Sequence, residues 1–168
     1  DVLSDRCISL VREGEVDIAI TASGTALNEF ASEHCFTDRF FLICRSDHPL
    51  ASRSEVTLEE LRDVDYISLS PHTSVQQHIA DSLGALGITS TSFQVQSVFT
   101  VAGLINAGLG VSPLPELTLP MFHNPELRSI PLAEPGVTRP VHILWRKDRP
   151  LSIAAETMLE LIRRHKPM

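Results

Sequence analysis

The chain has 168 residues, 43% of them hydrophobic and 21% charged, and its net charge is −7. These values are typical of a soluble globular protein with one core or two small lobes. The negative charge, with no Lys/Arg run longer than two, argues against a segment that itself grips nucleic acid phosphates. No apolar run approaches a membrane span, and no signal peptide opens the chain. Three cysteines without metal-ligand spacing indicate reduced thiols in a cytoplasm.

The N-terminal part of the chain is predicted to form a helix followed by a strand. Residues 4–13 form a predicted helix that buries Ile8 and Val11 and ends at Gly14, since glycine tolerates the positive φ of a helix end. The apolar run VDIAI at 16–20 is typical of a parallel strand that is buried on both faces. We therefore expect a parallel α/β arrangement from the start of the chain.

The middle of the chain continues this alternation of strands and helices. A predicted strand at 36–44 is followed by a short helix after Thr57, which has a glutamate three residues on, as in a capping box. A strand at 66–69 then leads into a helix at 74–83. Its expected cap is Ser74, with Gln77 three residues on, as in a capping box.

Residues 93–115 are predicted to form a strand, a helix and a second strand. Ser97 can cap the helix because its hydroxyl can accept a free backbone N–H, and the glycines of the AGLG turn end it. Pro113 and Pro115 are expected to keep the far end of the second strand at a sheet edge. This order is a βαβ unit, which builds parallel sheets.

The last part of the chain is predicted to be irregular at 116–136, with a possible strand at 127–132. The final helix is expected to begin at Ser152 and to bury one apolar stripe, formed by Ala155, Met158, Leu159 and Ile162. The predicted parallel strands are 16–20, 66–69, 93–96 and 111–114, with 141–145 completing the first lobe, and the predicted helices are 4–13, 74–83, 97–107 and 152–164.

Four segments carry a family resemblance: REGEVDIAIT, FFLICRSDHPLA, QSVFTVAGLINAGLGVSPLP and RPVHILWRKDRPLSIAAETMLELIRRH. In order and spacing they resemble the effector-binding domain of LysR-type transcriptional regulators, over essentially the whole chain. The resemblance implies an α/β fold of the periplasmic-binding-protein type 2, with two Rossmann-like lobes joined by two crossover strands. Residues 1–44 with 137–168 are the expected first lobe, and residues 45–136 the second.

The same resemblance implies that parts of the regulator lie upstream of this chain. The first strand and helix of the first lobe are expected to be missing, and the DNA-binding winged helix-turn-helix would lie further upstream. Residues 1–168 alone are therefore predicted to be partly unfolded, or to pair open strand edges with another chain. The expected partners are a small-molecule effector and further copies in a homodimer or tetramer. DNA would be bound only through the missing domain, and no membrane is expected.

The candidate effector-binding residues lie at predicted strand ends and helix starts, where free N–H groups and the helix dipole attract carboxylates. The resemblance maps Thr21, Thr73 and Ser74 onto positions that often touch effector, and Phe99 could contact an apolar part. The alternative is that these hydroxyls only cap helices. The full set is Thr21, Ser23, Ser70, Thr73, Ser74, Ser97, Phe99, Thr100 and Ser112.

Other chemistries have weak support in the sequence. His72 and His78 lack a third ligand for a metal, and His48 suits a hinge better than a catalytic base. Cys35 and Cys44 are expected to be buried and inert rather than redox sensors. No phosphate loop, nucleophile elbow or cofactor motif is present, so we expect no enzyme and no cofactor. The remaining alternative is a solute-binding protein of a transporter, which would share the fold.

Overall fold

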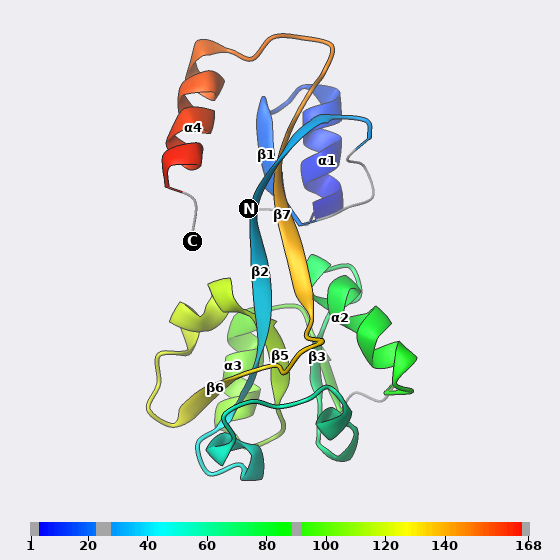
Figure 1. Cartoon of the computed structure of the whole chain (residues 1–168), viewed down its shortest axis with the longest axis vertical. Helices are drawn as coiled ribbons and strands as arrows, with labels where there is room; N and C mark the ends of the chain where they lie inside the picture. Colours follow the sequence, from blue (N-terminus) through cyan, green and yellow to red (C-terminus); the bar gives the residue numbers. More distant parts are fainter. Residues whose placement is uncertain (1–3, 23–27, 89–91, 166–168) are drawn as a thin grey trace. The chain divides into compact units, whose positions relative to one another are not determined.

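The computed structural model describes residues 4–22, 28–88 and 92–165 (Figure 1). The chain separates into two compact units, one formed by Asp1–Thr37 with Arg139–Met168 and the other by Asp38–Thr138. The long strand β2 (Ala31–Arg45) runs through the first limit, so its two halves belong to different units. The boundaries between the two units fall after residues 37 and 138. The boundaries predicted from the sequence lie after residues 44 and 136.

The first unit is a sheet covered by one helix on each face. Strand β1 (Ile18–Thr21) lies beside β7 (Thr138–Trp145), which in turn lies beside β2. Helix α1 (Ser4–Glu13) packs with Ala19 and Leu144, and α4 (Ile153–Arg164) packs with Ile143 on the opposite face. The two helices are predicted correctly, and Gly14 ends α1 with a φ of 75°.

Strand β1 differs from the prediction in direction and in burial. It pairs with β7 antiparallel, from Ile18 opposite Trp145 to Thr21 opposite His142, so no parallel neighbour is present among the described residues. Ile20 is 49% exposed, so this strand is not buried on both faces. The apolar run did not reveal this, because the same residues suit either direction and the partner strand lies more than 100 residues away.

The second unit contains the predicted βαβ units. Strands β3 (Ile67–Leu69) and β4 (Phe93–Val95) are paired in parallel, and a parallel bridge joins Tyr66 to Val111 just before β5. These pairings confirm the parallel order of the three strands. The remaining elements of the unit are α2 (Ser74–Ala85), α3 (Val98–Asn106), β5 (Ser112–Pro115), β6 (Leu127–Pro131) and short 3-10 helices at Pro49–Ser52, Glu59–Asp63 and Glu116–Phe122.

Strand β5 is not the free edge that its prolines suggested. All four of its residues are buried, and it pairs antiparallel with β2, with Leu42 opposite Pro113 and Phe40 opposite Pro115. The backbone N–H and C=O of Val111 point toward β3. Because backbone groups alternate sides along a strand, the backbone nitrogens of Pro113 and Pro115 point to the same side. Proline has no N–H, and the pairing with β3 therefore stops at the Val111 bridge.

The core of each unit is mainly aliphatic, as the low aromatic content predicts. In the second unit Ile79 and Leu83 of α2, and Val101 and Ile105 of α3, are buried as expected. In α4 the prediction for Met158 is wrong, because its side chain is 51% exposed. Over the described ranges, no helix combines the length and apolarity needed to cross a bilayer.

Candidate functional site

The second unit brings two helix N-termini to one edge of its parallel strands. Ser70 directly follows β3, and its N–H donates to the carbonyl of Val95 at the end of β4, at 2.8 Å. Helices α2 and α3 both begin a few residues beyond these strand ends. Because the carboxyl ends of parallel strands meet at one sheet edge, the free N–H groups of both helices lie there.

Thr73, rather than Ser74, caps helix α2. Its hydroxyl accepts a hydrogen bond from Gln76 N–H at 3.2 Å and donates to the carbonyl of Ser70 at 2.8 Å. Ser74 is the first residue of the helix, so the expected cap is wrong by one position. Both residues have the hydroxyl that a cap requires, and only the backbone turn decides which one occupies the position.

The N-terminus of helix α3 is capped by Ser97, as predicted. Its hydroxyl accepts from Phe99 N–H at 3.2 Å. Phe99 is 69% exposed, and Thr100 beside it is also exposed. This end of the site therefore offers an apolar ring next to hydroxyl and amide groups.

Ser112 is placed apart from these helix ends. It is 1% exposed, and its hydroxyl donates to the carbonyl of Ile67 at 2.8 Å, which joins β5 to β3. This hydrogen bond gives Ser112 a structural role inside the second unit.

In the first unit, Thr21 ends strand β1 and is 4% exposed. Its partner across the sheet is His142 of β7, whose ring lies in edge-to-face contact with that of His34 on β2, with centroids 5.5 Å apart. Sequence reasoning missed both histidines, because only the register of three strands brings them to Thr21. Ser23 lies outside the described residues.

Burial lowers the pKa of His142, and the neighbouring charge of His34 lowers this pKa further. The Nδ1 atom of His142 is buried and has no hydrogen-bond partner among the described residues. Nε2 of His34 lies 3.0 Å from the hydroxyl oxygen of Thr37. The lowered pKa means that His142 favours its neutral state.

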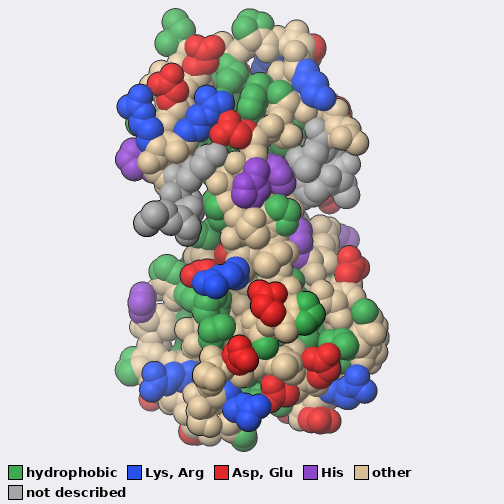
Figure 2. Space-filling view, in the orientation of Figure 1, with side chains coloured by type: hydrophobic (Ala, Val, Ile, Leu, Met, Phe, Trp, Pro, Cys, Tyr) green, Lys and Arg blue, Asp and Glu red, His purple; other side chains and the backbone are tan. Residues whose placement is uncertain are grey.

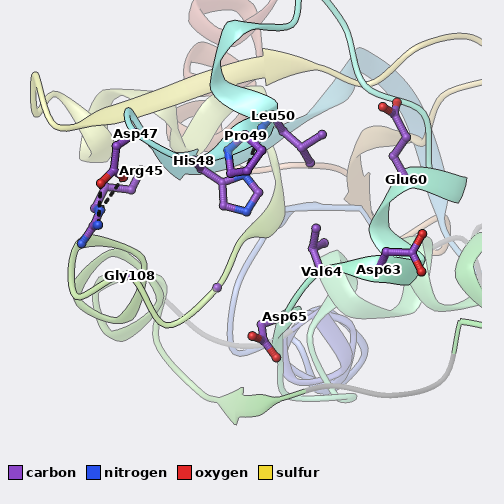
Figure 3. A pocket seen from close by; sticks show the side chains of 11 residues that line it. Arg45, Asp47, His48, Pro49, Leu50, Glu60, Asp63, Val64, Asp65 and Gly108 are labelled. Atoms are coloured by element: carbon purple, nitrogen blue, oxygen red, sulfur yellow. Dashed lines mark hydrogen bonds and ion pairs between the residues drawn. The ribbon is translucent and has the colours of Figure 1, made fainter.

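A separate cavity of about 640 Å³ opens at the other end of the second unit (Figure 3). It is lined by residues that follow β2, precede β3 and follow α3, and it contains none of the predicted site residues. Asp47 is paired with Arg45 at 2.6 Å, and three more acidic side chains, Glu60, Asp63 and Asp65, lie around the cavity. This acidic lining repels anions, so the cavity does not suit a carboxylate.

His48 lies at this cavity, inside the second unit rather than at the limit between the units. Its Nδ1 accepts from Leu50 N–H at 3.2 Å and caps the short helix at Pro49–Ser52. Burial lowers the pKa of His48, and the carboxylate of Asp47 acts in the opposite direction. These contacts make His48 a local capping residue.

Cys35 and Cys44 are buried, as expected from the sequence, and Cys7 is partly exposed. Burial raises the pKa of the Cys44 thiol to about 11, and the charge of Asp47 acts in the same direction. A thiol reacts as the thiolate, so Cys44 is unreactive near neutral pH.

The family model described as LysR substrate binding domain matches residues 2–167. The chain belongs to the LysR family. This LysR domain is 31% identical over 163 residues to YbhD of Escherichia coli K12, described as an uncharacterized HTH-type transcriptional regulator, and the match covers 95% of the chain and 50% of YbhD. The chain spans about half the length of the curated relatives it matches.

Solved structures show the same fold at low sequence identity. The regulatory domain of Synechocystis PCC6803 CcmR in complex with 2-PG has a TM-score of 0.87 and 18% identity, over 98% of this chain and 80% of that chain. The effector-binding domain of QuiR in complex with shikimate has a TM-score of 0.83 and 17% identity, over 98% of this chain and 78% of that chain. The chain is thus a regulatory domain of a non-enzyme family, with the periplasmic-binding-protein type 2 fold that the resemblance implied.

Proposed function

We propose that this LysR domain senses a small carboxylate and thereby controls DNA binding by the rest of the regulator. The observation that carries the proposal is the meeting of two helix N-termini, at Thr73 and Ser97, on one edge of the parallel strands. Free N–H groups and the positive ends of the helix dipoles favour an anion there. The exposed ring of Phe99 would contact an apolar part of the molecule. The complexes of CcmR with 2-PG and of QuiR with shikimate support a small molecule as effector.

The proposed mechanism is a shift in the populations of two conformations. An effector that binds one conformation more tightly stabilises it in proportion to the difference in affinity. The resemblance supports a cytoplasmic homodimer or tetramer, with effector bound in a cleft between lobes and DNA contacted by a winged helix-turn-helix outside this chain. The buried thiols of Cys35 and Cys44 agree with a reducing compartment.

Ser74→Ala and Thr73→Ala separate effector binding from helix capping. A screen of small carboxylates by thermal shift on the full-length regulator first identifies a ligand. Ser74→Ala is expected to weaken that ligand roughly tenfold or more, because a hydrogen bond to a charged group is worth roughly 1.5–3 kcal/mol. Thr73→Ala is expected to lower the free energy of unfolding by about 0.5–2 kcal/mol, because it removes the cap of α2.

Calorimetry and thermal melts of both variants provide the measurement. Unchanged affinity in both variants, together with a lower melting temperature, would show that these hydroxyls serve only the helix. A screen in which no carboxylate stabilises the protein would contradict the proposed class of effector.

Residues 1–168 on their own are expected not to bind operator DNA at physiological salt. Their net charge of −7 opposes a polyanion, and on the face shown in Figure 2 the basic and acidic side chains of the described residues are interspersed. A gel-shift titration against the full-length regulator checks this. Tight, sequence-specific binding by residues 1–168 would place DNA recognition in this domain instead.

A further inference from the structure

A buried tyrosine of the second unit reaches the first turn of helix α2. Tyr66 directly precedes β3, is 3% exposed and belongs to the same apolar cluster as Ile79 and Leu83 of α2. Its hydroxyl donates a hydrogen bond to Oε1 of Gln76 at 2.9 Å. The spacing of Gln76, Ile79 and Leu83 places them on one face of the helix. Gln76 therefore brings a polar group to the buried face of α2, and the tyrosine hydroxyl satisfies it.

The backbone of Tyr66 is held from two sides. It forms a parallel bridge with Val111, just before β5, and its carbonyl accepts from Ser92 N–H at 2.9 Å, just before β4. These contacts and the packed ring make the hydroxyl a fixed point inside the second unit. Burial raises the pKa of Tyr66 to about 12, so the hydroxyl keeps its proton and remains a donor near neutral pH.

Gln76 also takes part in the cap of α2. Its backbone N–H donates to the hydroxyl of Thr73 at 3.2 Å, and that hydroxyl donates to the carbonyl of Ser70 at 2.8 Å. The N–H of Ser70 in turn donates to the carbonyl of Val95 at the end of β4. These contacts connect the buried tyrosine, through the first turn of α2, to the strand end that leads into α3. A rotation of α2 about its axis would break the bond to Tyr66, because a hydrogen bond tolerates only small changes in distance and angle.

We propose that Tyr66 and Gln76 are positioning residues that fix the rotation of helix α2 and thereby aim the N–H groups of its first turn at the carboxylate. This inference rests on the proposed function, and it adds a pair that acts through the helix rather than by contact with the bound molecule. A misdirected N–H donor loses much of its hydrogen bond to an anion. Donors that are already in place before binding also lose less conformational entropy when the anion arrives.

The first measurement follows helix α2 in the full-length regulator without ligand, by hydrogen–deuterium exchange and mass spectrometry. Tyr66→Phe keeps the packed ring and is expected to speed exchange in the first turn of α2 by about three- to tenfold, the net worth of one hydrogen bond. Ser68→Ala is the matched control, because Ser68 is also buried beside β4 and its hydroxyl donates to the carbonyl of Phe93 at 3.4 Å. Exchange in α2 that is no faster in Tyr66→Phe than in Ser68→Ala would overturn the proposal.

The second measurement uses acetate as the probe, with chloride at the same ionic strength as the reference. The rise in melting temperature of the full-length regulator with acetate concentration gives the apparent affinity. Tyr66→Phe and Gln76→Met are each expected to weaken acetate binding by about three- to tenfold. Methionine keeps the length of the side chain and the backbone N–H that bonds to Thr73. The double variant should bind no more weakly than either single variant, because both remove the same hydrogen bond, and additive losses would contradict a joint role.

The two measurements separate the positioning role from the proposed function. Acetate that binds the wild type and Tyr66→Phe equally well would overturn the positioning role and leave carboxylate sensing intact. A wild-type regulator that neither acetate nor any other carboxylate stabilises would contradict the proposed function. In that case the exchange of α2 in Tyr66→Phe still decides whether the tyrosine holds the helix in place.

Discussion

Replacing Gly110 by alanine is expected to lower the free energy of unfolding by about 2–6 kcal/mol. Gly110 has a φ of 148°, a conformation that side chains other than hydrogen rarely adopt. A Cβ there would lie 2.4 Å from the carbonyl oxygen of Asp65 and 3.2 Å from Cγ1 of Ile67. The oxygen belongs to the backbone and already accepts the N–H of Val111 at 2.8 Å, so it cannot move away without breaking the bridge between β3 and β5.

Gly103→Ala is the matched control for this substitution. Gly103 lies inside helix α3, and an added Cβ would have nothing within 4 Å. Alanine at this position is expected to stabilise the protein by about 0.5–1 kcal/mol, because it restricts the unfolded chain and favours the helix. Thermal and urea unfolding of both variants measure the contrast. Equal stability of Gly110→Ala and the wild type would show that the turn before β5 can be rebuilt without the contact with Asp65.

Ile105→Ala is expected to cost about 2–5 kcal/mol, since it removes a fully buried side chain and leaves a cavity. Ile105 is 0% exposed and lies on the buried face of α3, in one apolar cluster with Val101, Ile67 and Leu114. The total stability of a domain is only about 5–15 kcal/mol, so this loss should lower the melting temperature by several degrees.

Phe99→Ala on the same helix provides the comparison. The Phe99 ring is 69% exposed, so its removal is expected to change the free energy of unfolding by less than about 0.5 kcal/mol. If the ring contacts effector as proposed, the same variant should weaken binding in calorimetry. A larger loss of stability from Phe99→Ala than from Ile105→Ala would reverse the assignment of the two faces of α3.

The helices of this protein could be predicted from the sequence because their determinants are local. Ser97 and Ser152 cap α3 and α4, and Gly14 ends α1, through contacts within a few residues of each other. The buried faces of α2 and α3 also follow from spacing alone, since a helix has a fixed period. The direction of β3 and β4 could be inferred because a helix connects them, and such crossovers join parallel strands.

The strand pairings and the composition of the site were decided only by tertiary structure. The apolar run of β1 is compatible with either strand direction, and its antiparallel pairing depends on β7, which returns from the far end of the chain. The same register places His142 opposite Thr21 and beside His34, a proximity that no spacing in the sequence encodes. Sequence patterns report the period and the ends of each element, because those depend on neighbouring residues. Which elements become neighbours depends on the packing of the whole chain.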